Sequence, residues 1–186
     1  MRRWHISPDM PQAYPYTIMT MLILPQRKHI RLRDFDYSSA NAYFITVCVK
    51  HFERLLGTIR SGICRLSEIG AEAAAYLQTI PEIYPDVILD EFIIMPNHLH
   101  AIIIIDRHSS SYQSNAFGKP VAGSVSMHVN HFKGRVKKWC KNNSWSEFDW
   151  QPKFHDHVIR NEQEYWLIKN YIIHNTRNWQ DDRFYT

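Results

Sequence analysis

The sequence is poor in cysteine, and its three cysteines show none of the patterns that bind zinc or build a disulfide framework. Cys48, Cys64 and Cys140 are far apart, and no two of them form a Cys-x-x-Cys pair. This argues against a zinc knuckle and against a small secreted domain held by disulfides. It favours a reducing compartment, so we expect a cytoplasmic protein.

The sequence also lacks an apolar run long enough to cross a membrane, since such a helix needs about 20 apolar residues. The apolar stretch 19–24 follows two arginines, as in a signal peptide. However, Pro8, Pro11 and Pro15 interrupt this region, and no small-residue cleavage site follows it. We therefore expect neither export nor a membrane partner.

A strong excess of one charge is missing as well. The 22 lysines and arginines exceed the 18 acidic residues by only four, which permits a nucleic-acid partner without establishing one. The 186 residues are 45% hydrophobic and 13% aromatic, enough for the core of one domain. We expect an irregular N-terminal tail over 1–25 and a single domain over 26–186.

Strand and helix signals alternate along that domain. Ser61-Gly62 is a hairpin turn signal, Ser67 and Ser124 are good helix caps, and Asn161 with Glu164 forms a capping box. The expected elements are a strand at 42–50, a hairpin at 55–66, a helix at 68–80 ended by Pro81, strands at 87–95 and 98–105, a helix from 125, a strand within 150–160 and a helix to about 174. The central order βαββαβ predicts an α+β fold, a ferredoxin-like or RRM-like sandwich with an antiparallel sheet, an added β-hairpin and a C-terminal helix that carries Tyr171.

The segment 92–105 holds the residues most suggestive of chemistry, because two apolar runs flank His98-Leu99-His100. Side chains alternate between the faces of a strand, so both histidines project to the same side and Leu99 to the other. Two imidazoles side by side can bind a divalent metal. On this spacing alone, two histidines on the solvated face of a sheet are the commoner arrangement.

The last predicted helix places Tyr171 and Asn175 one turn apart on one face. If that face looks toward the histidine pair, a divalent cation held by His98, His100 and the Asn175 amide would polarise a phosphodiester. A nearby cation favours the phenolate, so Tyr171 could attack phosphorus and form a phosphotyrosine. A tyrosine considered without further signals is more often an ordinary core aromatic.

Four segments of the chain together resemble the REP-associated tyrosine transposases (RAYT) of the HUH single-tyrosine superfamily. They occur in the family's order and are IRLRDFDYSSANAYFITVCVK (30–50), LDEFIIMPNHLHAIIII (89–105), WQPKFHDHVIRNEQE (150–164) and YIIHNTRNW (171–179). The resemblance implies an RRM-like fold and metal-dependent, site-specific cleavage and joining of single-stranded DNA through a 5′-phosphotyrosine. It implies palindromic DNA hairpins as partners and no nucleotide cofactor.

By this resemblance, His98 and His100 are the paired ligands of a Mg or Mn ion and Tyr171 is the nucleophile. Asn175 matches the third polar ligand, although Thr176 follows it where the family usually has proline. Tyr165 lies six residues before Tyr171, which turns it by about 120° around the helix, so only one of the two can face the site. The resemblance is compatible with a monomer or a homodimer.

A further set of basic residues is predicted to contact DNA. For each of them, a solvated or structural role is the ordinary alternative. The set consists of Arg31, Arg33, Lys133, Arg135, Lys137, Lys138, His155, His157 and Arg160.

Two other functions fit the same residues. A non-catalytic module of this fold could bind structured nucleic acid without cleaving it. A metal-dependent hydrolase could use water in place of Tyr171 and would turn over without a covalent intermediate. Metal-dependent cleavage of hairpin DNA, and the presence or absence of a protein–DNA adduct, separate the three.

Overall fold

The computed structural model describes residues 35–106 and 123–186. The predicted tail, Arg31, Arg33 and most of the loop that follows residue 105 lie outside the described residues. Four strands form the main sheet in the order β4-β5-β1-β6, and every neighbouring pair is antiparallel. They are β1 (Ala42–Cys48), β4 (Val87–Ile94), β5 (His98–Ile105) and β6 (His155–Ile159). This strand order confirms the predicted ferredoxin-like fold.

Strand β1 lies between β5 and β6, as its sequence predicts. All seven of its residues are buried, and a strand that is apolar on both faces needs cover on both. Its register aligns Thr46 with His100 on one side and with His155 on the other. Three polar side chains from three strands therefore lie in a row across one face of the sheet.

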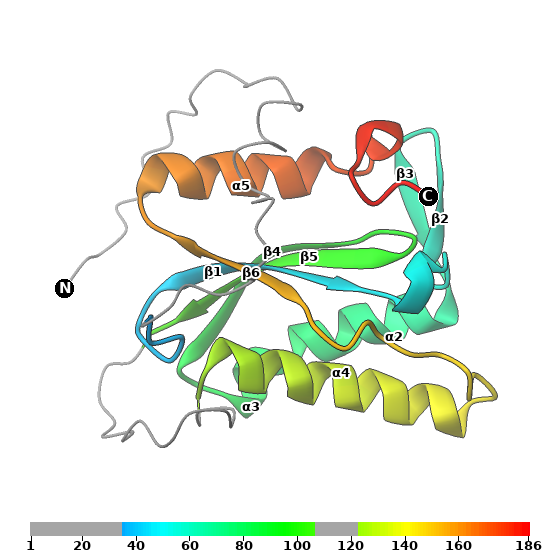
Figure 1. Cartoon of the computed structure of the whole chain (residues 1–186), viewed down its shortest axis with the longest axis horizontal. Coiled ribbons are helices and arrows are strands. Elements are labelled where there is room, and N and C mark those ends of the chain that lie inside the picture. Colours follow the sequence, from blue (N-terminus) through cyan, green and yellow to red (C-terminus); the bar gives the residue numbers. More distant parts are fainter. Residues whose placement is uncertain (1–34, 107–122) are drawn as a thin grey trace.

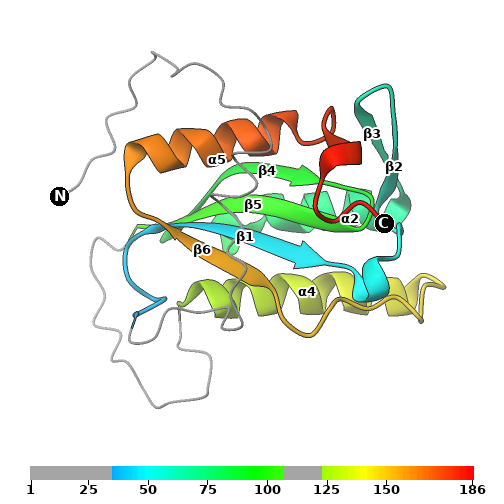
Figure 2. The ribbon, with the colours of Figure 1, turned by 45° about the horizontal axis from the view of Figure 1, so that its top comes forward.

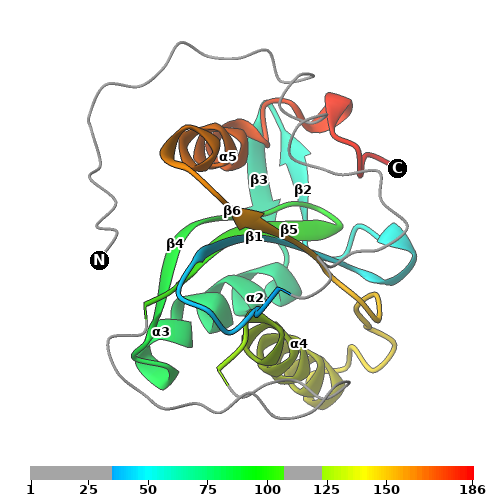
Figure 3. The ribbon, with the colours of Figure 1, turned by 60° about the vertical axis from the view of Figure 1, so that its left-hand side comes forward.

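Helices cover the two faces of the sheet unequally. The helices α2 (Glu68–Gln78) and α4 (Val125–Asn142) pack on one face, and α5 (Glu162–His174) lies alone on the other (Figures 1 and 3). A larger apolar cluster fills the α2/α4 side, and a smaller one that includes Phe44, Ile102 and Ile168 fills the α5 side. Since β5 alternates, His98 and His100 point with Ile102 toward α5.

The predicted caps are present. The hydroxyl of Ser67 accepts from the Gly70 amide at 3.1 Å, and that of Ser124 accepts from the Met127 amide at 3.3 Å. One boundary was wrong: Pro81 does not end the first helix. Helix α2 ends at Gln78, and Pro81 lies in the first turn of a second short helix, α3 (Ile80–Ile83). Proline is tolerated there because the first helical amides have no partner within the helix.

The predicted hairpin forms a sheet of its own. Strands β2 (Gly57–Arg60) and β3 (Ile63–Leu66) pair only with each other, and the ribbon stands at the end of the main sheet beside the C-terminal segment (Figure 2). Its turn residues Ser61 and Gly62 both have positive φ, 51° and 73°, as a two-residue hairpin turn requires.

The chain beyond α5 returns to the sheet. Helix α5 ends at His174 as predicted, and turns lead through Asn175 to the short helix η2 (Trp179–Asp181). The last residues then reach the end of the sheet near η1 (Lys50–Phe52), where β1 ends and β5 begins. Within residues 35–106 and 123–186, no helix has the length and apolar character needed to cross a membrane.

Candidate active site

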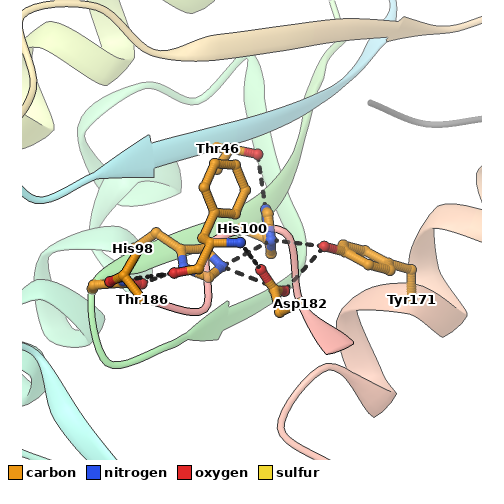
Figure 4. A network of polar contacts seen from close by, with 8 residues as sticks. Thr46, His98, His100, Tyr171, Asp182 and Thr186 are labelled. Carbon is orange, nitrogen blue, oxygen red and sulfur yellow. Dashed lines mark hydrogen bonds and ion pairs between the residues drawn. The ribbon is translucent and has the colours of Figure 1, made fainter. Parts of the chain in front are cut away.

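The two histidines of β5 lie side by side, as their spacing predicts. Their Nε2 atoms are 3.0 Å apart, and both side chains are fully buried (Figure 4). The solvated-face alternative is therefore wrong. Phe44 stacks on His100 at 5.1 Å between ring centroids, so the pair sits in apolar surroundings on the α5 side of the sheet.

Burial keeps both imidazoles neutral. It lowers the pKa of His98 to about 3, and it lowers the pKa of His100 well below its usual 6.5, with the neighbouring His98 adding to the shift. The Asp182 carboxylate lies 4.0 Å from His98 Nε2, but a neutral imidazole forms no ion pair with it. A neutral histidine keeps a lone pair on one nitrogen, which is the form that binds metals.

Two neighbours orient the histidine rings. Nδ1 of His98 donates to Asn97 Oδ1 at 2.8 Å, and the same amide is fixed because its Nδ2 donates to the Phe184 carbonyl. His98 therefore carries its proton on Nδ1 and leaves Nε2 free to accept. Nδ1 of His100 is 2.8 Å from Thr46 Oγ1, a hydroxyl that can accept as well as donate. Both rings can thus point an unprotonated Nε2 toward one place.

Tyr171 reaches the same place from α5. Its hydroxyl lies 3.2 Å from His100 Nε2 and donates to Asp182 Oδ2 at 3.3 Å (Figure 4). Tyr165 points elsewhere, as the predicted rotation around the helix requires, and its hydroxyl donates to Asp90 at 2.5 Å. Burial and the Asp90 carboxylate raise the pKa of Tyr165 to about 12. Of the two tyrosines, only Tyr171 contacts the histidines.

Asp182 completes the group, and sequence reasoning missed it. It comes from the segment after η2, is buried, and places a carboxylate oxygen so that the ligand atoms of His98, His100 and Asp182 all lie within 4.8 Å of one another. Its other oxygen accepts from the Phe184 amide at 2.6 Å, which fixes the carboxylate. No motif or spacing singles out Asp182, since only the return of the chain brings it to β5.

These residues fit a divalent metal ion. Two nitrogens about 2.1 Å from one ion and about 90° apart around it would be about 3.0 Å from each other, which is the observed Nε2–Nε2 separation. Two neutral imidazoles and a carboxylate suit Mn, Fe, Zn or a Mg site completed by water. Asn97 and Thr46 supply the outer hydrogen bonds that ligating histidines normally make.

Asn175, the predicted third ligand, follows α5 at its C-cap and is fully buried. Neither its amide oxygen nor its amide nitrogen has a hydrogen-bond partner among the described residues. A buried amide without a partner costs about 1–3 kcal/mol, so a ligand that used the oxygen would relieve this cost. Its role as a ligand stays a prediction, with Asp182 as a second candidate for the same role.

The predicted DNA contacts on α4 lie on the far face of the sheet from the histidines, and three of the four are engaged within the fold. Lys133 donates to the Gln151 carbonyl at 2.6 Å, Lys137 pairs with Asp149 at 2.8 Å, and Arg135 donates to Thr79 while its guanidinium lies over the ring of Tyr76. Lys138 has no such contact among the described residues. DNA binding by these residues stays a prediction.

The predicted contacts near β6 lie on the site's side of the sheet. His155 is 6.4 Å from Phe184 between ring centroids, and burial lowers its pKa. His157 pairs with Glu164 at 2.7 Å, so it links β6 to the first turn of α5. Arg160 is exposed just before that helix. The structure thus gives His157 a structural partner and leaves DNA contacts by the other two as a prediction.

The C-terminal segment covers the site. Phe184 is buried, and its ring centroid lies 4.7 Å from that of His98 and 6.0 Å from that of His100. Trp179 packs against His98 at 6.0 Å. The histidines, Tyr171 and Asp182 are therefore enclosed by α5, the sheet and residues 179–186.

Comparison with known proteins identifies a relative of this chain. An uncharacterized protein of Haemophilus influenzae is 36% identical over 167 residues, which cover 86% of this chain and 93% of that protein. The chain belongs to the same family as this protein. No family model matches the sequence.

Among solved structures, the REP-associated tyrosine transposase bound to a REP hairpin matches with a TM-score of 0.56. The match covers 84% of this chain and 76% of the transposase at 16% identity. This chain therefore has the fold of that transposase. This confirms, at the level of the fold, the relationship that the four sequence segments predict.

Proposed function

We propose that the protein is a metal-dependent transposase-type endonuclease that cleaves and rejoins single-stranded hairpin DNA through Tyr171. The observation that carries the proposal is the position of the Tyr171 hydroxyl, 3.2 Å from His100 Nε2 and 3.3 Å from Asp182 Oδ2. An ordinary core tyrosine has no need of two buried histidines and a buried carboxylate at its hydroxyl. The solved transposase of this fold is bound to a REP hairpin, which supports hairpin DNA as the substrate class.

In this proposal the site residues have two roles, metal binding and nucleophilic attack on phosphorus. His98, His100 and either Asp182 or Asn175 would hold a divalent ion, Mg or Mn, which would act as a Lewis acid on the scissile phosphate. Tyr171 Oη forms the bond to phosphorus, and the bond from phosphorus to the 3′ oxygen breaks. The phenol gives up its proton toward Asp182, and the leaving oxygen takes up a proton to become a free 3′ hydroxyl. The DNA remains attached to Tyr171 by its 5′ phosphate, and the reverse reaction joins strands without ATP.

The test is a search for the covalent adduct on a denaturing gel. Wild-type protein, labelled single-stranded hairpin DNA and Mn or Mg should give a slowly migrating protein–DNA species. Tyr171→Phe should abolish this species while leaving hairpin binding intact, because only the nucleophilic oxygen is lost. Tyr165→Phe is the matched control on the same helix and should keep the adduct, since Tyr165 bonds to Asp90 instead.

Two further substitutions test the predicted metal ligands. His98→Ala and His100→Ala should each abolish cleavage and weaken binding of Mn measured directly by calorimetry. Unchanged Mn binding in both variants would show that other residues bind the ion. An adduct that persists in Tyr171→Phe would exclude this tyrosine as the nucleophile.

A second candidate function is a nucleic-acid-binding module without catalysis. The enclosure of the site by Phe184 and Trp179 favours it, because a phosphodiester reaches the histidines only if residues 179–186 move. Hairpin binding by the wild type with no adduct in either metal would support this function. Cleavage with no adduct would instead indicate a hydrolase.

A further inference from the structure

The β2–β3 ribbon is the part of the fold that the proposed reaction leaves unused. It pairs with no strand of the main sheet, yet it stands at the catalytic end of the molecule (Figures 1 and 2). Gly62 in its turn lies against Arg177, since a Cβ at Gly62 would be 3.3 Å from Arg177 Cγ. Two residues later, Trp179 packs on His98. The tip of the ribbon is therefore connected to the site by a few residues.

One face of the ribbon is exposed to solvent. The register pairs Thr58 with Arg65 and Arg60 with Ile63, and paired residues of an antiparallel ribbon share a face. All four of these side chains are exposed, Ile63 to 68%, whereas Ile59 and Cys64 on the other face are half-buried. The ribbon thus presents two arginines, a threonine and an isoleucine outward.

The charge of this face is uncompensated. The ten residues 57–66 include Arg60 and Arg65 and no acidic residue. Neither arginine makes a side-chain hydrogen bond or ion pair within residues 35–106 and 123–186, in contrast to Lys133, Arg135 and Lys137 on α4. Guanidinium groups held on a strand pair and left unpaired are arranged for a polyanion.

We propose that the β2–β3 ribbon binds the double-stranded stem of the hairpin DNA. This inference rests on the proposed function and names the element that holds its substrate. The major groove of a duplex admits a two-stranded β-ribbon, arginine recognises phosphate and guanine bidentately, and an apolar side chain contacts the thymine methyl. Arg60, Arg65 and Ile63 provide these groups on one face.

The position of the ribbon explains how a stem bound there would serve the reaction. The stem ends in single-stranded flanks, and the flank that leaves a stem on the ribbon passes Arg177 and Trp179 before it reaches His98. The basic face of α4 cannot serve this purpose, because α4 covers the opposite face of the sheet from α5 (Figures 1 and 3), and His98 and His100 point toward α5. The ribbon thus sets the distance between the stem and the cleaved phosphate.

The test compares two double variants of equal charge. Arg60→Gln/Arg65→Gln removes the two ribbon charges, and Lys141→Gln/Lys153→Gln removes two exposed charges from the α4 side of the molecule. Each is titrated with a stem-loop DNA and with an unstructured strand of the same length, over a range of salt. The ribbon variant should bind the stem-loop roughly tenfold more weakly, and the slope of log K against log salt should fall by about two. Its binding of the unstructured strand should stay close to that of the wild type.

The α4-side variant changes none of the predicted DNA contacts and should bind both DNAs as the wild type does. The assignment is overturned if the ribbon variant loses no more stem-loop affinity than the α4-side variant, or if it loses affinity for both DNAs equally. Ile63→Ser alone, at a position that is 68% exposed, should also weaken stem-loop binding. If the wild type binds no hairpin DNA, that result contradicts the proposed function itself. If it binds the stem-loop but forms no adduct, the ribbon assignment is still tested by the same titrations.

Discussion

At the scale of single residues, the site depends on neighbours that hold the histidine rings. Asn97 bridges His98 and the Phe184 carbonyl, and Thr46 bonds to His100 from the adjacent strand. The period of a strand is enough to predict that His98 and His100 share a face. It cannot predict Thr46, which depends on the register of β1 against β5, or Asp182, which depends on the path of the chain after α5.

The buried histidines predict that the protein loses stability in mild acid. In the folded state, burial holds the pKa of His98 at about 3 and lowers that of His100 and His155, whereas in the unfolded chain each histidine takes up a proton near pH 6.5. The contribution of these neutral histidines to the free energy of unfolding is therefore fully present above pH 6.5, and it is lost as the pH falls toward 3. Between pH 7 and pH 5, the free energy of unfolding should fall by roughly 2 kcal/mol for each histidine that stays neutral in the folded state.

Urea unfolding at pH 7, 6 and 5 with a chelator present measures this loss. His174, which is exposed, gives the control: His174→Gln should show the same pH dependence as the wild type. A stability that stays constant from pH 7 to pH 5 would mean that the site histidines are charged in the folded protein.

At the scale of elements, local sequence patterns predicted the positions of the helices and strands. Caps, turn residues and apolar stripes located nearly every helix and strand. The spacing of Tyr165 and Tyr171 showed that only one of them can face the site, and the family resemblance favoured Tyr171. The end of α2 was wrong because Pro81 fits the first turn of a helix as well as it terminates one. The apolar stripe of α4 showed which side is buried, but it could not show which face of the sheet the helix covers or which of its lysines bond to the loop after it.

The packing of α2 gives a prediction with an internal control. A Cβ on Gly70 would lie 1.9 Å from the backbone oxygen of Leu56, so Gly70→Ala forces α2 and the start of the hairpin apart. We expect a loss of about 3 kcal/mol in unfolding free energy. On α4, a Cβ on Gly134 meets nothing within 4 Å, so Gly134→Ala should stabilise the protein by about 0.5–1 kcal/mol. Equal effects of the two substitutions in denaturant unfolding would show that α2 does not pack this closely on residue 56.

At the scale of the whole molecule, the sheet separates the side with the larger apolar core from the side that holds the candidate site. The α2/α4 side holds the larger apolar core, and the α5 side holds the histidines, Tyr171 and Asp182. The strand order follows from the ferredoxin-like pattern, so the fold and half of the site could be predicted from the sequence. The closing of the site by residues 179–186 could not, because these residues have no periodic pattern and gain their positions only from contacts with distant strands.

This closure predicts that Phe184 limits access to the histidines. Its ring contacts those of His98 and Phe52, and its carbonyl accepts from Asn97. Phe184→Ala removes the ring and keeps the backbone bond, so solvent should reach His98 and His100 while Asn97 still orients them. Hydrogen–deuterium exchange at the C2 carbon of each imidazole, read by mass spectrometry, should become at least about tenfold faster at these two histidines and stay unchanged at His174. Trp145→Ala, at an exposed position in the turn after α4, should leave all three rates unchanged. Exchange at His98 that is already fast in the wild type would mean that residues 179–186 do not close the site in solution.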